Sequence, residues 1–150
     1  CRVFCGRLCI RRNKLAKYVV TGTYVTVNGD DISANTARAE LVINAAEVDT
    51  TDFGSGGFTE IIGGLKSGQV TLDFHNDFGA GGISNLLSDL VGTIGTVTIN
   101  PTGTAVSSEN PTWTAPVMIS SFTPVAGAVG DLATFSVTFP TSGEISYATA

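Results

Sequence analysis

Apolar and polar residues alternate with a period of two along much of the chain, a pattern typical of strands that bury one face. The clearest case is residues 69–75, where Val70, Leu72 and Phe74 share one face and polar residues occupy the other. Similar patterns predict strands at residues 17–27, 38–44, 96–100, 113–123, 133–139 and 144–148. The first of these strands ends at Asn28-Gly29-Asp30-Asp31, a strong signal for a tight turn. The chain is therefore predicted to be mainly β.

One segment changes to the helical period. Its apolar residues follow the spacing i, i+3, i+4, i+7 and i+8 of a single helix face: Ile83, Leu86, Leu87, Leu90 and Val91. Gly92 follows where a left-handed residue often ends a helix. Burial of each large side chain contributes roughly 1.5–3 kcal/mol, which is enough to dock a short helix that would be unstable alone. We expect this face to pack on the inward row of residues 69–75.

Two stretches show neither period and are predicted to be irregular. Residues 101–111 form a polar turn between strands. Residues 49–67 are long, glycine-rich and yet apolar, and loops of this length in compact domains tend to be functional. Because such a loop cannot bury its own apolar side chains, we expect it to form a surface that binds a partner. Its candidate residues are Asp49, Thr50, Thr51, Asp52, Phe53, Phe58, Ile61, Ile62 and Leu65.

Length and composition favour one folded domain. The chain has 150 residues, of which 43% are hydrophobic and 14% charged, too apolar and too weakly charged for a disordered chain. Its apolar runs are only a few residues long, far short of a membrane-spanning segment, so we expect no membrane insertion.

Charge is distributed unevenly. Residues 1–17 hold six of the eight basic residues and no acid, whereas residues 18–150 hold two basic residues against thirteen acidic ones, a net charge of −11. Proteins that bind nucleic acid neutralise phosphates with lysine and arginine. The body of the chain is therefore expected to repel DNA.

The basic leader also holds all three cysteines, Cys1, Cys5 and Cys9, so no disulfide framework supports the body. Their spacing invites a metal or iron–sulfur interpretation, but a fourth ligand is not nearby, and we expect no metal site. Leu15-Ala16-Lys17-Tyr18 resembles a natural start in which Leu stands for the initiating Met, so we expect residues 1–14 to be an extension. We divide the chain into a leader, residues 1–15, outside the fold, and a single domain, residues 16–150.

Catalytic machinery is not expected. His75 is the only histidine and could share a strand face with Asp73. However, the Gly-x-Ser-x-Gly turn that carries the nucleophile of many serine hydrolases is absent from the sequence. The glycine-rich stretches at residues 54–57 and 79–82 lack the Lys-Ser/Thr of a phosphate-binding loop. We therefore predict a protein that is not an enzyme, with no catalytic residues and no cofactor.

Several motifs resemble the major tail tube proteins of long-tailed, non-contractile bacteriophages. In the C-terminal half these are an Asn-Pro before the Trp113 strand, residues 122–125 (FTPV), the turn at 127–131 (GAVGD) and the strand at 135–140 (FSVTFP). Upstream, residues 48–54 (VDTTDFG) and 64–68 (GLKSG) are also similar to that family. The resemblance spans about residues 16–148, and no further immunoglobulin-like domain is expected after the last strand.

The resemblance implies an antiparallel β-sandwich or barrel-like fold with one flanking α-helix. It further implies hexameric rings that stack into a hollow tube, through which DNA passes to the host without specific binding. By the same implication, the loop at residues 49–67 would be a self-assembly loop that contacts a neighbouring subunit or the next ring. The expected partners are other copies of this chain and the tape-measure, tail-tip and tail-terminator proteins. The protein would be made in the host bacterial cytoplasm and located in the virion.

A second interpretation is a secreted or surface β-sandwich that binds carbohydrate. Such modules present rows of exposed aromatic side chains, whereas Trp113 is the only tryptophan and is expected to be packed. The tail tube interpretation is therefore preferred.

Overall fold

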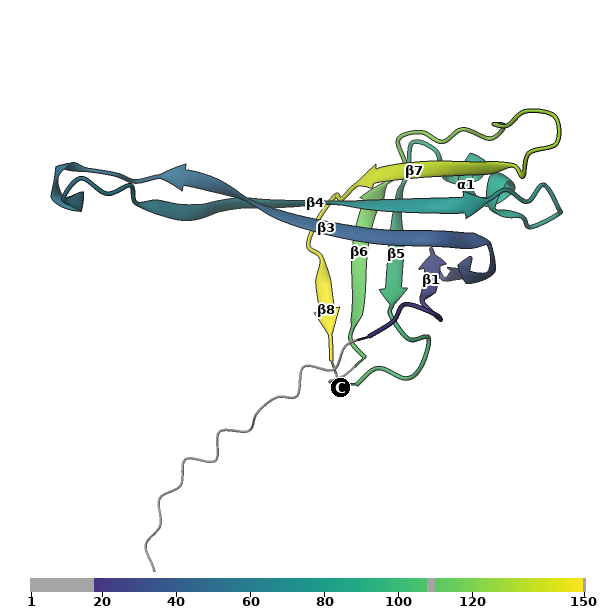
Figure 1. Ribbon diagram of the computed structural model, residues 1–150, viewed down its shortest axis with the longest axis horizontal. Helices are drawn as coiled ribbons and strands as arrows, with labels where there is room; N and C mark the ends of the chain where they lie inside the picture. Colours follow the sequence, from purple (N-terminus) through teal and green to yellow (C-terminus); the bar gives the residue numbers. More distant parts are fainter. Residues whose placement is uncertain (1–17, 108–109, 150) are drawn as a thin grey trace, which may run out of the picture.

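Two antiparallel sheets pack face to face as a sandwich, and one long hairpin projects from it (Figure 1). This computed structural model describes residues 18–107 and 110–149. The larger sheet has the strand order β2-β1-β5-β6-β8, and the smaller has the order β3-β4-β7. The strands are β1 (Tyr24–Val27), β2 (Asp30–Asp31), β3 (Thr36–Asp49), β4 (Ile61–His75), β5 (Ile94–Asn100), β6 (Thr112–Met118), β7 (Thr134–Pro140) and β8 (Ser146–Ala148). The predicted mainly antiparallel β fold is confirmed.

The core lies between the sheets and uses the positions that the period of two predicts. Val70, Leu72 and Phe74 of β4 are at most 1% exposed. In the register of the smaller sheet they lie beside three inward residues of β7: Phe139, Val137 and Phe135. The larger sheet adds Val25, Val27, Val97, Ala115 and Val117 to the same cluster. Burial of these side chains joins the two sheets.

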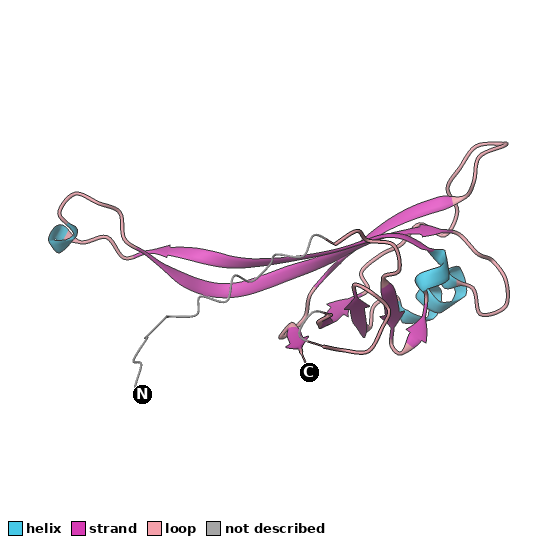
Figure 2. Cartoon of the chain, turned by 60° about the horizontal axis from the view of Figure 1, so that its bottom comes forward, coloured by secondary structure: helices cyan, strands magenta, loops and turns pink. Residues whose placement is uncertain are grey.

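Within the described residues there is one α-helix, α1 (Ile83–Leu90), at the end of the sandwich where β4 ends (Figure 2). It begins after Gly82 and its C-cap is Val91. Gly92 follows with a φ of 83°, the left-handed conformation that the sequence predicted.

Residues 61–67 correct the prediction of an irregular loop, because they are strand. They form the start of β4 and pair with β3 as far as Asp49 and Ile61, so β3 also extends beyond the predicted residues 38–44. Only residues 50–60 remain as a tip, which contains the 3₁₀ turn η2 (Phe53–Ser55). The sequence pattern did not indicate this strand, because both faces of the hairpin are exposed to solvent and its residues need not alternate between apolar and polar. Glycines at 63 and 64 lower its β propensity further.

The first strand is shorter than predicted, because β1 begins at Tyr24 and not at residue 17. Its partner β5 ends at Asn100, opposite Tyr24, and the next residue, Pro101, has no N–H to continue the ladder. The predicted turn after β1 is confirmed, since Asn28 and Gly29 both have positive φ, 52° and 94°. Strand β6 likewise ends at residue 118, short of the predicted 123, where β5 begins opposite it.

The predicted leader, residues 1–15, with its three cysteines, lies outside the described residues. In the part of the chain that the structure describes, no helix has the length and apolar character needed to cross a membrane.

Candidate functional site

The hairpin of β3 and β4 beyond the sandwich, here called the ribbon (residues 44–67), carries the predicted assembly residues (Figure 1). The exposed fraction is 110% for Phe53, 79% for Phe58 and 87% for Leu65, and both Ile61 and Ile62 are more than half exposed. Of the described residues, none between 44 and 67 is buried. Exposed apolar side chains gathered on one segment are uncommon on proteins that remain monomeric in water.

Asp52 shapes the tip of the ribbon. Its Oδ1 accepts a hydrogen bond from the N–H of Gly54 at 2.7 Å, and its own N–H donates to Ser55 Oγ at 3.1 Å. These reciprocal bonds form a capping box around the short turn. The turn is therefore fixed by Asp52, and it holds Phe53 out in solvent.

The two threonines close the neck of the tip. The N–H of Thr50 donates to the carbonyl oxygen of Glu60 at 2.9 Å, and the N–H of Glu60 donates to Thr51 Oγ1 at 2.9 Å.

Hydrogen bonds from the side chain and backbone of Thr51 lower the pKa of Asp49, because they stabilise its charged form. Asp49 therefore remains ionised at neutral pH. The predicted loop thus divides into polar residues that shape the tip and apolar residues that face solvent.

Four of the five predicted helix-face residues lie against the core. Ile83 and Leu87 are buried, and Leu86 and Leu90 are half-buried against the same cluster. Val91 is the exception and corrects the prediction, since it is 44% exposed. The backbone leaves the helical conformation at this residue, where ψ is 129°, so its side chain no longer follows the helical period.

The smaller sheet presents a polar face away from the core. Thr71 lies beside Thr138 in the register, and their hydroxyl oxygens are 3.3 Å apart. Two residue pairs further along, at the next pair on this face, the hydroxyl of Ser136 donates to the carboxylate of Asp73. Cross-strand polar pairs of this kind stabilise a sheet face that remains in water.

Arg38 lies on the same face between acidic residues. It forms an ion pair with Glu40, and its Nη1 is 3.9 Å from Asp73 Oδ2. His75 lies on this face next to Asp73 along β4, and it is exposed. Among the described residues, no group of three or more His, Cys, Asp or Glu side chains is arranged to hold a metal ion.

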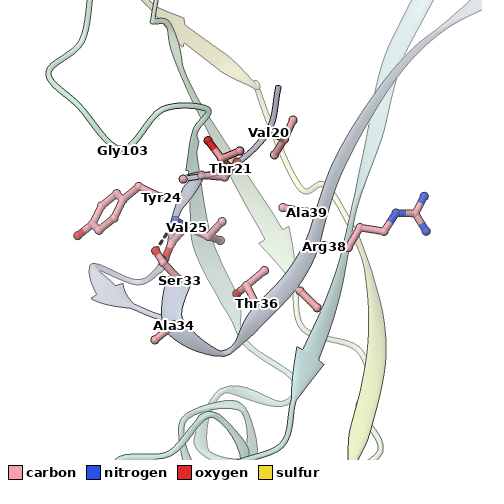
Figure 3. A pocket seen from close by; sticks show the side chains of 13 residues that line it. Val20, Thr21, Tyr24, Val25, Ser33, Ala34, Thr36, Arg38, Ala39 and Gly103 are labelled. Atoms are coloured by element: carbon pink, nitrogen blue, oxygen red, sulfur yellow. Dashed lines mark hydrogen bonds between the residues drawn. The ribbon is translucent and has the colours of Figure 1, made fainter. Parts of the chain in front are cut away.

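A hollow of about 450 Å³ lies between β1 and the start of β3 (Figure 3). Its lining is mostly small or hydroxylic, and in it the N–H of Val25 donates to Ser33 Oγ at 2.9 Å. Arg38 is the one charged residue of the lining, and Figure 3 shows its side chain pointing away from the hollow. The lining therefore provides no acid–base pair.

The sequence did not predict a second hollow, of about 580 Å³, where the ribbon leaves the sandwich. Its lining residues are Ile43, Lys66, Ser67, Thr141, Gly143, Glu144 and Ile145. We call it the base hollow. Beside this hollow the chain segments approach closely at Gly68, where a Cβ would lie 2.7 Å from the carbonyl oxygen of Val42 and 2.8 Å from Ile145 Cδ1.

Solved structures contain the same fold. One similar chain belongs to the virion of a native gene transfer agent particle, with a TM-score of 0.65 and 16% identity over 83% of this chain and 95% of that chain. Another belongs to the tail of an empty gene transfer agent particle refined with C6 symmetry (TM-score 0.63, 17% identity, 81% and 88% covered). A third belongs to the six-fold symmetrised baseplate of the anti-feeding prophage (TM-score 0.59, 8% identity, 90% and 98% covered).

This chain shares their fold. No protein-family model matches the sequence, and no curated protein does. The similarity therefore lies in the arrangement of the strands and the helix.

Proposed function

We propose that this protein is a structural subunit of a phage-type tail, which assembles into hexameric rings that stack into a hollow tube. The observation that carries the proposal is the shared fold with chains of a gene transfer agent virion, of its C6-symmetric tail and of a six-fold baseplate. The sequence motifs that resemble major tail tube proteins support the same function.

The ribbon supports assembly, because a single chain leaves it uncovered. Its aromatic and aliphatic side chains are exposed on a segment that extends away from the core. In a ring or a stack, the ribbon would lie against a neighbouring subunit, and this contact would bury the apolar surface.

The edges of the smaller sheet support a ring. Its edge strands β3 and β7 are both antiparallel to β4, so they are parallel to each other. All copies in a cyclic ring point the same way along the axis, so β7 of one copy would meet β3 of the next as a parallel pair. This pairing would also remove two open edges that favour aggregation in a monomer.

The polar face of the smaller sheet suits the wall of a bore. Its hydroxyl groups and carboxylates lie on the side opposite the core, and residues 18–150 carry a net charge of −11. Such a wall would repel phosphates within about 10 Å at 0.1 M salt, and DNA would pass without specific binding. The expected partners are tape-measure, tail-tip and tail-terminator proteins. The location would be the virion, after synthesis in the host bacterial cytoplasm.

A double variant tests whether the polar face of the smaller sheet lines the bore. Arg38 is held between Glu40 and Asp73, so replacing Glu40 by Gln and Asp73 by Asn leaves its charge uncompensated. We expect assembled tubes of this double variant to retain short DNA oligonucleotides at low salt and to release them as salt rises. The matched control removes the same charge elsewhere, at the exposed residues Asp89 and Asp131. Equal retention by the two double variants would contradict a bore lined by this face.

Electron microscopy of the purified, concentrated protein, both as the full chain and as residues 16–150, tests the function. Tubes or six-fold rings are expected, and solitary particles in both preparations would overturn the proposal. The carbohydrate-binding alternative gains no support from Trp113. It is half-buried, and its ring packs against Tyr147 with the ring centroids 5.2 Å apart.

A further inference from the structure

We infer that the tip of the ribbon docks into the base hollow of a neighbouring copy, with Phe53 as its apolar anchor. The inference rests on the tail-subunit function proposed above, and it names the partner surface of the ribbon. The occupant of the base hollow is thus a second copy of this chain. Four features of the molecule support this assignment: reach, shape, charge and the form of the hollow.

A chain cannot place its tip in its own base hollow. The hollow lies at Ile43 and Lys66, whereas the tip begins after the pair of Asp49 and Ile61, six residues further along β3. At about 3.3 Å per residue, this separation is roughly 20 Å. Bending the tip back would break the ladder between β3 and β4. A tip that occupies this hollow must therefore come from another molecule.

The shape of the tip is set before docking. The capping box of Asp52 and the hydrogen bonds at the neck fix the turn that carries Phe53. An aromatic side chain with two rotatable bonds on a fixed turn loses little conformational entropy when it is buried. Phe53 is therefore suited to anchor the tip against the apolar side chains in the lining of the hollow, Ile43 and Ile145.

The charge of the tip complements the rim of the hollow. Residues 50–60 contain two acidic residues, Asp52 and Glu60, and no basic one. Lys66 is exposed in the lining and makes no ion pair within 4.0 Å with the described residues. Glu144 lies in the same lining and opposes an acidic tip. Lys66 would pair with a tip carboxylate such as that of Glu60.

The hollow itself is formed within one subunit. Its wall is the segment that crosses from β7 to β8, and hydrogen bonds hold this segment to both sheets. The N–H of Thr141 donates to the carbonyl oxygen of Gly68 at 2.9 Å, and the N–H of Ser142 donates to that of Pro116 at 2.8 Å. A smaller apolar hollow, lined by Ala39, Leu41, Ile43, Ile99 and Trp113, meets the base hollow at Ile43. A tip can thus enter without rearrangement of the sandwich.

Tip and hollow are different surfaces, so the contact is head-to-tail. A head-to-tail contact repeats from copy to copy and either closes into a ring or continues as a filament. The docking therefore supplies the polarity that a stack of rings requires.

Photo-crosslinking tests the assignment. p-Benzoylphenylalanine replaces Phe53 in the full chain, the assembled particles are irradiated, and the intermolecular products are mapped by mass spectrometry. Crosslinks to Ile43, Lys66 or residues 141–145 are expected. The matched control carries the same group at Phe78, which is 60% exposed in the loop between β4 and α1, and it should not label the hollow.

The outcomes separate the docking from the proposed function. If tubes form but Phe53 labels another surface, the docking is wrong while the tail-subunit function remains. If the unmodified chain forms neither rings nor tubes, the proposed function is overturned, and the docking with it.

A charge reversal provides a second measurement. The Lys66→Glu variant should raise the concentration needed for assembly several-fold, and combining it with Glu60→Lys should restore assembly towards the original value. Glu144→Gln should lower that concentration, because it removes a like charge from the hollow. Unchanged assembly of the Lys66→Glu variant would overturn the docking.

Discussion

Replacing Phe53 and Phe58 by Ser in one variant should separate folding from assembly. Both rings are exposed in the single chain, at 110% and 79%, and neither belongs to the core cluster. The substitutions should therefore change the free energy of unfolding by less than about 0.5 kcal/mol each. The folded sandwich remains, and only the tip loses its apolar surface.

The effect on assembly should be much larger. Burying a phenylalanine side chain contributes roughly 1.5–3 kcal/mol, so the loss of two such contacts costs at least about 3 kcal/mol for each tip. Since 1.4 kcal/mol corresponds to a factor of ten, the critical concentration for assembly should rise by roughly a hundredfold or more.

Urea unfolding of the unassembled protein measures the first quantity, and sedimentation with electron microscopy over a range of concentrations measures the second. Phe78→Ser serves as the control, because it removes an exposed phenylalanine outside the ribbon. If the double variant forms tubes at the original concentration and of the original length, the ribbon is not an assembly surface. If the double variant fails to fold, the two phenylalanines stabilise the sandwich, and the expectation drawn from their exposure is wrong.

Three further predictions concern single residues. Leu87→Ala should lower the free energy of unfolding, measured by urea denaturation, by about 2–5 kcal/mol, because Leu87 is fully buried. Val91→Ala should change it by less than about 0.5 kcal/mol, because Val91 is exposed. Equal effects would contradict the helix packing described above. Gly68→Ala should destabilise the fold by about 1–3 kcal/mol in thermal melts, because the new Cβ would lie closer than 3 Å to backbone and side-chain atoms. Gly63→Ala should be nearly neutral, because nothing lies within 4 Å of a Cβ there. A larger effect at Gly63 than at Gly68 would refute the close approach. The pKa of Asp49 is lowered from its usual 3.8, so the stabilisation that its carboxylate gives the tip is complete above pH 3.8 and is lost as pH falls through the lowered pKa. Hydrogen exchange of the Thr51 amide, which donates to Asp49, should accelerate in this pH range when measured by NMR. Asp49→Asn should abolish this change.

The sequence predicted those elements that bury one face. The strand at Val70, Leu72 and Phe74 and the helix from Ile83 follow the periods of two and 3.6, because each must place its apolar residues against one core. The ribbon has no such constraint within a single chain, so its strands at residues 61–67 carried no period to recognise. The base hollow could not be predicted either, because it joins Lys66 to residues 141–145, which are far apart in the sequence.

The exposure of the ribbon also bears on its stability. Ordering the backbone of one residue costs about 1–2 kcal/mol in conformational entropy, and two strands alone form at best a marginally stable hairpin in water. Residues 44–67 contribute no buried side chain to the core, so hydrophobic burial within the chain offsets little of this cost. Contact with a neighbouring subunit would supply the missing burial. In the proposed assembly, the ribbon would therefore gain most of its stability from contact between subunits, which would link the order of this segment to the growth of the tube.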